Sequence, residues 1–195
     1  MATFSVWANQ EMTIPLTGIE QTTIINENNV LRGVFYFGSP QSGVKLQTEI
    51  NAGVDNVSLF PKIRLSGIER NTEYQLLNCN DYIVSGWVYR LIQAGTTASN
   101  QPQYTQSIGS TITDGSARFQ CVSKCHPITE IKLALSELLL NSAIAGTGVQ
   151  LGNTINGGSA IAIHYEITDT FTQVFSTFTC PQLCIAINDC VESDI

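Results

Sequence analysis

The cysteines are the residues of this sequence whose type and spacing most resemble a metal-binding or disulfide-forming site. The chain has six of them: Cys79, Cys121, Cys125, Cys180, Cys184 and Cys190. Cys121 and Cys125 are separated by three residues, as are Cys180 and Cys184, and His126 directly follows the first pair. This spacing loosely matches zinc ligand sets, in which paired cysteines are about two to four residues apart. The same residues could instead form disulfides or stay free structural thiols.

Of these three states we expect disulfides, with all six cysteines as candidates. The clustered cysteines fall near the ends of expected strands, where a cross-link closes a loop and typically adds about 2–4 kcal/mol of stability. The sequence cannot select a pairing. We expect no metal ion and no cofactor, and free thiols and a zinc site remain as the alternatives.

The sequence motifs give little indication of catalysis. The histidines are His126 and His164, and His164 lies in an alternating apolar run that places it on a strand face. The sequence contains no nucleophile elbow, phosphate-binding loop, HExxH motif or dinucleotide-binding fingerprint. We therefore expect no catalytic residues and a protein that is not an enzyme.

Aromatic side chains offer a third kind of chemistry, because exposed rings can contact sugars. Trp87, Tyr89 and Tyr104 are the candidates for such glycan contacts. Trp87 lies in an apolar run and is expected in the core. Tyr104 follows the Gln-Pro-Gln sequence of residues 101–103 in an expected loop, which makes it the better candidate for the surface.

The composition limits the class of protein that must position these side chains. The chain has 195 residues, of which 43% are hydrophobic and only 13% are charged, whereas a typical domain is about 25% charged. Thr, Ser, Asn and Gln make up roughly a third of it. This balance excludes a disordered chain. The net charge of −7 argues against nucleic-acid binding, as does the confinement of all nine basic residues between Arg32 and Lys132.

Short runs of alternating apolar and polar residues dominate the chain, a pattern typical of antiparallel β structure. Val44, Leu46, Thr48 and Ile50, for example, share one face of an expected strand. The expected strands span residues 31–38, 44–50, 57–68, 83–95, 116–122, 130–135, 160–168 and 172–180. The predicted fold is all-β, an antiparallel β-sandwich or jelly-roll-like architecture with at most one short helix.

Punctuating residues refine this pattern. Pro61 predicts an edge strand or a bulge within its run, because proline cannot donate to a sheet ladder. Gly86 predicts a bulge or bend inside the expected strand at 83–95. Asp114-Gly115, between two extended runs, predicts a hairpin.

The chain is expected to divide into two regions. Residues 1–75 form an N-terminal β region, which begins either with a first strand or with an extended arm laid on a neighbour. Residues 76–195 form a β-sandwich-like domain, with a helix candidate at 137–145 that Ser136 can cap. The start of the sequence does not resemble a signal peptide, and no apolar run is long enough to span a membrane.

Residues 88–124 are similar to a small β module that recurs in virion proteins of tailed bacteriophages. The matching residues are Tyr89, Ala94-Gly95-Thr96-Thr97, Pro102 with Tyr104, Gly109, Thr111, Thr113-Asp114-Gly115, Phe119 and Cys121. In physical terms, the AGTT turn ends a strand, the Pro-aromatic step pins a loop to the sheet, and the Asp-Gly turn opens a hairpin. Residues 130–169 also resemble surface proteins of phage heads or tails.

The resemblance implies a virion structural protein, assembled in the host cytoplasm. It favours a capsid decoration or cement protein that forms a homotrimer. Its other expected partners are virion proteins such as the major capsid or tail proteins. No nucleic-acid or membrane partner is expected. A tail, baseplate or fibre component is one alternative, and a carbohydrate-binding adhesion module is another. Few charges suit large protein interfaces, since desolvating charge is costly. A particle released from its host would also reconcile disulfides with the lack of a signal peptide.

Overall fold

The computed structural model describes residues 3–19, 29–77, 80–169 and 182–195. These residues form sixteen strands, a 3-10 helix (Ile128–Glu130) and one short α-helix. The sheets are antiparallel, which confirms the all-β prediction and is consistent with a β-sandwich. Among the described residues, no helix is long and apolar enough to span a membrane. The strand expected at residues 172–180 lies outside the described part of the chain.

The chain divides into two compact units, and one is inserted into the other. Unit 1 contains residues 1–62, 127–172 and 185–195, and unit 2 contains residues 63–126 and 173–184. This division differs from the predicted boundary between residues 75 and 76. That cut would separate strand β5 (Glu73–Tyr74) from its partner strand β8 (Gly95–Thr96). Composition gave no sign of the insertion, because both units have the same low-charge β character.

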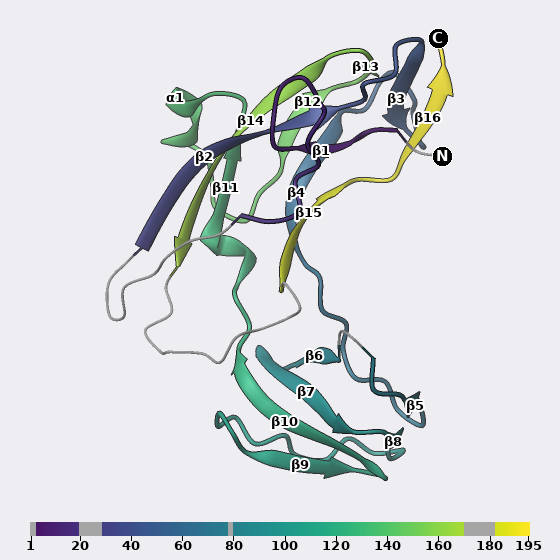
Figure 1. Cartoon of the computed structure of the whole chain (residues 1–195), viewed down its shortest axis with the longest axis vertical. Helices are drawn as coiled ribbons and strands as arrows, with labels where there is room; N and C mark the ends of the chain where they lie inside the picture. The colour runs from purple at the N-terminus through teal and green to yellow at the C-terminus, as the bar shows by residue number, and fades with distance from the viewer. Residues whose placement is uncertain (1–2, 20–28, 78–79, 170–181) are drawn as a thin grey trace. The chain divides into compact units, whose positions relative to one another are not determined.

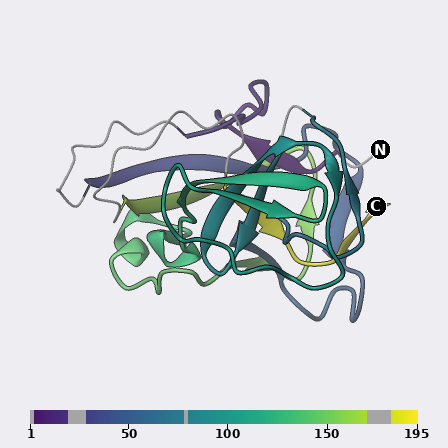
Figure 2. The same ribbon diagram turned by 90° about the horizontal axis from the view of Figure 1, so that it is seen from below.

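The largest sheet of unit 1 is built on two long strands that run side by side (Figures 1 and 2). Its order is β1-β2-β14-β11. The strands span Ser5–Trp7, Asn29–Gly38, Ala160–Asp169 and Ile131–Ala134, respectively. β2 and β14 pair along their full length, from Gly38 with Ala160 to Asn29 with Asp169. Phe35, Phe37 and Ile163 are buried on one face, as alternation requires.

Two three-stranded sheets complete the β structure around β3 and β4. One has the order β12-β4-β15, with strands at Val149–Gly152, Val57–Ile63 and Leu183–Ile187. The other has the order β13-β3-β16, with strands at Ile155–Asn156, Val44–Thr48 and Cys190–Asp194. Val44, Leu46 and Thr48 are buried on one face, as predicted, but Ile50 lies beyond the strand and is 75% exposed.

Pro61 occupies a position that the sequence did not suggest. β4 is the middle strand of its sheet, so the expected edge position is wrong. Its last pair with β12 joins Leu59 to Val149, two residues before the proline. The missing N–H of Pro61 therefore costs no hydrogen bond to β12.

The expected helix is present but short. α1 spans Glu137–Leu140, and the Ser136 hydroxyl accepts a hydrogen bond from the N–H of Leu139, as predicted for its N-cap. Leu140 is buried, which anchors the single turn to unit 1. The remainder of the predicted helix, up to residue 145, forms turns instead. A run this short depends on packing and capping, since an isolated turn is unstable in water.

An ion network crosses the largest sheet of unit 1. Glu166 on β14 lies between Arg32 on β2 and Lys132 on β11, which are its register partners. Oε2 of Glu166 lies 2.5 Å from an Arg32 nitrogen, and Oε1 lies 2.6 Å from the Lys132 nitrogen. Hydrogen bonds from Lys132 and then Arg32 lower the pKa of Glu166. The carboxylate thus links three strands.

Unit 2 consists of a four-stranded sheet, β6-β7-β10-β9, and the small β5-β8 pair. The four strands span Asp81–Val84, Trp87–Gln93, Ala117–Lys124 and Thr111–Asp114. Its main core cluster is aromatic and includes Tyr74, Tyr89, Tyr104 and Phe119. These rings meet largely edge to face, an arrangement that aromatic quadrupoles favour.

Two turns of unit 2 contain the glycines for which the sequence predicted a hairpin (Gly115) and a bulge or bend (Gly86). The Asp114-Gly115 hairpin is confirmed, since Asp114 pairs with Ala117 and Gly115 has a φ of +65°. The expected single strand at residues 83–95 is wrong, because Val84 pairs with Trp87 across a two-residue turn. Ser85 and Gly86 both have positive φ, so they form a tight hairpin turn rather than a bulge.

Candidate functional site

The carboxylate of Asp114 joins three separate segments of unit 2. It ends β9, and its side chain is fully buried. Its Oδ2 accepts hydrogen bonds from the Tyr104 hydroxyl at 2.7 Å and from Arg70 Nη1 at 2.6 Å. Its Oδ1 accepts the backbone N–H of Ala98 at 2.9 Å. These partners satisfy a charge that would otherwise be too costly to bury.

Several residues of the expected β module lie close to this carboxylate. The Thr97 hydroxyl donates to the carbonyl of Glu69 at 2.7 Å, which ties the AGTT turn to the chain beside Arg70. A Cβ on Gly115 would lie 2.1 Å from the Thr96 carbonyl oxygen, so this position has no room for a side chain. The motif is therefore a set of contacts that holds two turns and the loop carrying Tyr104 together.

Burial changes the acidity of the two tyrosines in this region. Desolvation, and then the hydrogen bond to Asp114, raises the pKa of Tyr104 far above its usual range. Desolvation raises the pKa of Tyr89 to about 12. Both phenols therefore stay protonated near neutral pH and act as hydrogen-bond donors rather than as bases.

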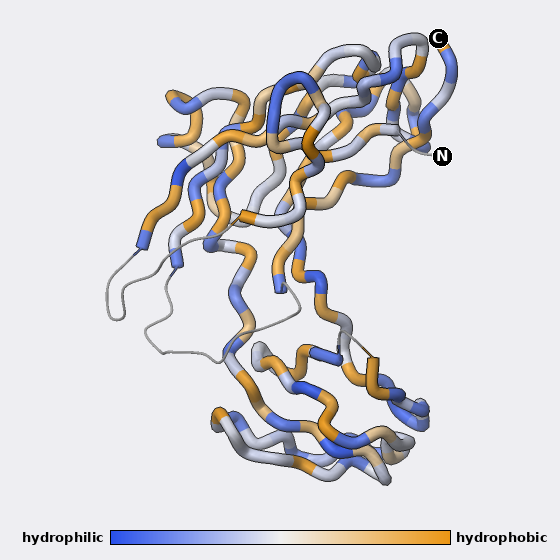
Figure 3. The backbone as a smooth tube through the Cα atoms, viewed as in Figure 1, coloured by the Kyte–Doolittle hydropathy of each residue, from blue (hydrophilic) through white to orange (hydrophobic). Residues whose placement is uncertain are grey.

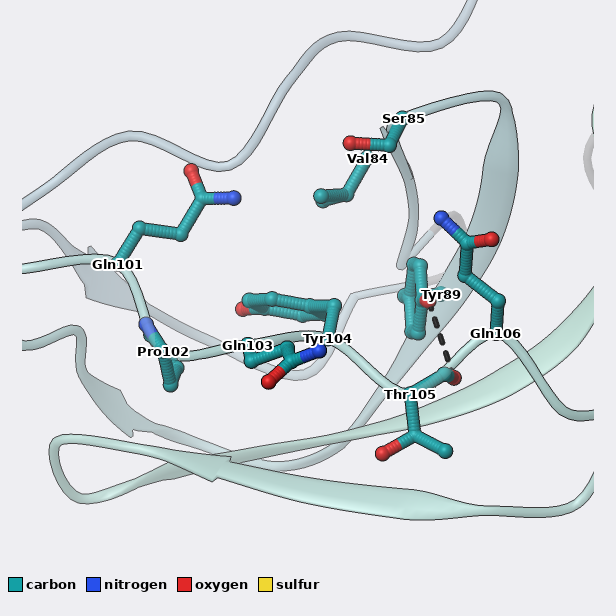
Figure 4. A pocket seen from close by; sticks show the side chains of 9 residues that line it. All are labelled: Val84, Ser85, Tyr89, Gln101, Pro102, Gln103, Tyr104, Thr105 and Gln106. Atoms are coloured by element: carbon teal, nitrogen blue, oxygen red, sulfur yellow. Dashed lines mark hydrogen bonds between the residues drawn. The ribbon is translucent and has the colours of Figure 1, made fainter.

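An open pocket of about 660 Å³ lies beside this centre. It is lined by Val84 and Ser85 of the β6–β7 hairpin, by Tyr89 of β7, and by residues 101–106. Figure 4 shows Gln101 and Gln106 on two sides of the pocket and the Tyr104 ring between them. None of the lining residues carries a charge. The pocket is therefore a polar, uncharged surface with an aromatic base.

The loop that lines the pocket is anchored by hydrogen bonds at two successive residues, Tyr104 and Thr105. The Tyr104 hydroxyl bonds Asp114, as described, and the Tyr89 hydroxyl donates to the carbonyl of Thr105 at 3.1 Å (Figure 4). The two tyrosine rings pack edge to face with their centroids 4.8 Å apart. The loop thus presents its glutamines from a fixed base.

Of the three predicted glycan-contact residues, Tyr89 and Tyr104 line this pocket and Trp87 does not. Tyr104 was expected at the surface, but it is 7% exposed, because its hydroxyl reaches Asp114 and its ring joins the core. Tyr89 is also buried, at 1% exposure. Both rings nevertheless contribute atoms to the pocket wall. Trp87 is half-buried and does not line the pocket, and the Lys124 ammonium lies 5.5 Å from its ring centroid.

Four of the predicted disulfide candidates can be placed in the structure. Cys121, Cys125, Cys184 and Cys190 are free thiols there, whereas Cys79 and Cys180 lie outside the described residues. Cys121 and Cys125 belong to different apolar clusters of unit 2, so their sequence spacing does not bring them together. Desolvation raises the pKa of Cys121 and of Cys190. The predicted disulfides of these four residues are therefore not formed in the structure, and a disulfide between Cys79 and Cys180 remains a prediction.

The histidines lie in structural positions. His164 lies on β14 between Val34 of β2 and Ala134 of β11, which confirms its expected place on a strand face. The backbone N–H of His126 donates to the Gln182 side chain at 2.8 Å. Neither histidine lines the pocket.

The most distinctive residues of the pocket were missed by the sequence interpretation. The sequence predicts a loop for Gln101 and Gln103 and a strand for Ser85, and it indicates no role for Gln106. The available signal was the uncharged Gln-Pro-Gln-Tyr-Thr-Gln sequence next to a residue that the module pins to the sheet. Ser85 could be placed only after the turn at Ser85-Gly86 was recognised.

Comparisons with known proteins do not extend this description. No protein-family model, no curated protein sequence and no solved structure matches the chain.

Proposed function

We propose that the protein is a non-enzymatic structural component of a tailed-phage virion and acts as a capsid decoration or cement protein. The proposal starts from the resemblance of residues 88–124 and 130–169 to phage virion proteins. The contacts of Asp114 support it, because Asp114 and Tyr104, which both belong to the first resemblance, are hydrogen-bonded to each other in unit 2. Such a protein works through buried area rather than through a reactive group.

The observation that carries the proposal is a group of exposed aliphatic side chains in and next to α1, which we call the α1 surface. Its exposed side chains, between 43% and 80% accessible, are Leu135, Leu138, Leu139 and Ile144. They fall within ten residues of the chain, where the tube in Figure 3 contains orange stretches. Grouped exposed aliphatic residues on a soluble protein mark an interaction surface.

The charge distribution makes this surface suitable for contact between copies of the chain. Between residues 133 and 165 the sequence contains a single charged residue, Glu137. Two such surfaces can approach with little charge to desolvate, whereas burying unpaired charge in an interface is costly. We assign the α1 surface to self-association, with a homotrimer as the expected assembly.

Light scattering after size-exclusion chromatography tests the self-association. The wild-type protein should form an oligomer at micromolar concentration, and the L138D/L139D variant should elute as a monomer. The matched control is I50D/V54D, which places the same two charges at other exposed aliphatic positions of unit 1. A monomeric wild type, or equal disruption by both variants, would contradict the assignment of the α1 surface.

Labelling of virions tests the location. Antibodies against the chain, or a cryo-electron microscopy map of the particle, should place it on the capsid shell. Labelling confined to the tail would favour the alternative of a tail, baseplate or fibre component. Intact particles that lack the chain altogether would contradict the whole proposal.

A further inference from the structure

The charge state of the unit 2 pocket restricts the ligand that it can hold. The surface from Val84 across to residues 101–106 offers amide, hydroxyl and carbonyl groups but no charged side chain. The nearby carboxylate of Asp114 is fully buried and already engaged by Arg70 and Tyr104. A charged ligand would lose its hydration here without gaining an ionic partner. The pocket therefore favours a neutral, polar ligand.

Two amide groups give the pocket its hydrogen-bonding capacity. Figure 4 shows the side chains of Gln101 and Gln106 rising on opposite sides of it. Within the described part of the chain, neither side chain hydrogen-bonds another protein group. Each amide offers two donor hydrogens and one acceptor oxygen. Neighbouring hydroxyl groups, each of which donates and accepts, match this pattern.

The base of the pocket supplies the complementary apolar contact. The Tyr104 ring and Val84 lie across the space from each other in Figure 4, and Pro102 lies beside Gln101. Because Asp114 fixes Tyr104, little of this base has to be ordered when a ligand binds. A ligand with hydroxyls at its edge and C–H groups on its face fits both kinds of surface.

We propose that this pocket binds a neutral carbohydrate. Ring hydroxyls bond the amides of Gln101 and Gln106, and the C–H face of a sugar lies toward Tyr104 and Pro102. The volume of about 660 Å³ lies within the range of small-ligand sites, roughly 300–1,000 Å³, and can take a mono- or disaccharide. This binding is independent of where the chain is located in a virion.

The experiment titrates the isotope-labelled full chain with defined sugars and follows its amide NMR signals. The neutral probes are lactose, maltose and N,N′-diacetylchitobiose, and the acidic probe is glucuronic acid. At least one neutral probe should shift the signals of residues 101–106 in a saturable way, with glucuronic acid bound at least tenfold more weakly. The titration extends to millimolar concentrations of each sugar, so that weak binding is also measured.

Matched variants decide whether the pocket itself binds. The Q101A/Q106A variant should weaken the bound sugar by about tenfold or more, because two neutral hydrogen bonds are lost. The Q75A/Q93A variant, which removes two exposed glutamines of unit 2 outside the pocket, should bind as the wild type does. The proposal is overturned if none of the neutral probes binds, if glucuronic acid binds best, or if Q101A/Q106A binds normally while folded.

Discussion

Asp114 in unit 2 and Glu166 in unit 1 are both buried carboxylates with basic partners, yet they are satisfied in different ways. Asp114 is fully buried and accepts a backbone N–H and a phenol as well as the Arg70 guanidinium. Glu166 lies between two cations whose side chains are 46% and 29% exposed. Water reaches the partners of Glu166 and screens these ion pairs.

The difference indicates what each carboxylate contributes. Asp114 helps to determine the path of the chain, because its carboxylate joins the segments that carry Arg70, Ala98 and Tyr104. Glu166 adds charge pairing to a sheet that is already held by the long β2–β14 ladder. Removing Asp114 should therefore disrupt structure, whereas removing Glu166 should only lower stability.

Each unit carries its own optical reporter, which allows this comparison to be measured. The chain has two tryptophans, Trp7 in unit 1 and Trp87 in unit 2. Replacing either one with Phe leaves the fluorescence of the other unit alone. The free energies of unfolding below refer to urea titrations of such single-tryptophan proteins.

The largest effect is expected for Asp114→Ala. The change leaves Arg70, the Tyr104 hydroxyl and the Ala98 N–H without their acceptor, and breaking a buried charged centre costs about 3–5 kcal/mol. The loss should appear in the Trp87 signal, while Glu73→Ala, at an exposed carboxylate of unit 2, should change little. An equal loss in the Trp7 signal would mean that the two units unfold together and would contradict a local role.

A smaller effect is expected for Glu166→Gln. The amide keeps the size of the side chain but loses the charge that attracts Lys132 and Arg32, so unit 1 should lose about 1–2 kcal/mol. The Trp7 signal measures this loss. Asp194→Asn removes the same charge from an exposed position of the same unit and serves as the control. A loss as large as that of Asp114→Ala would remove the contrast between the two carboxylates.

Acid should act on unit 1 through Glu166. Its pKa is lower in the folded protein than in the unfolded chain, so its contribution is present above the unfolded pKa of about 4.3 and is lost as pH falls through the folded value. The urea midpoint of the Trp7 signal should therefore fall between about pH 5 and pH 3. In Glu166→Gln this fall should be smaller, and an identical pH profile would contradict the assignment.

The smallest effect is expected for Ser136→Ala. The substitution removes the acceptor of the Leu139 N–H and should cost about 0.5–1 kcal/mol, detected as faster amide hydrogen exchange in α1. Ser136→Asp keeps an acceptor and should restore protection. Equal exchange in all three proteins would mean that the buried Leu140 alone holds the helical turn.

Local patterns were enough to predict much of the fold. Alternation placed Val44 and Leu46 on a buried face, and the Ser136 cap marked the start of α1, because each depends on residues close in sequence. The two-residue turn at Ser85-Gly86 was missed because an apolar run continues on both sides of it. The boundary of unit 2 was missed because an insertion is defined by which distant strands pair.

The residues of the pocket, too, are brought together by contacts that local sequence patterns do not reveal. Tyr104 was assigned to the surface from its polar neighbours, yet its hydroxyl bonds a carboxylate ten residues further along the chain. Both residues were recognised as parts of one module, but spacing alone could not indicate that they touch. The glutamines of residues 101–106 gained a candidate role only when the structure placed them around a common space.

The pairing of β2 with β14 also has a consequence for the order of events during synthesis. Gly38 and Ala160 are partners, so β2 leaves the ribosome long before the strand that completes its ladder. At typical rates of translation that wait is on the order of ten seconds. Strands β5 to β10, in contrast, all lie between Glu73 and Lys124 and can pair as soon as they emerge. Strands β5 to β10 can therefore pair with one another while β2 still waits for β14.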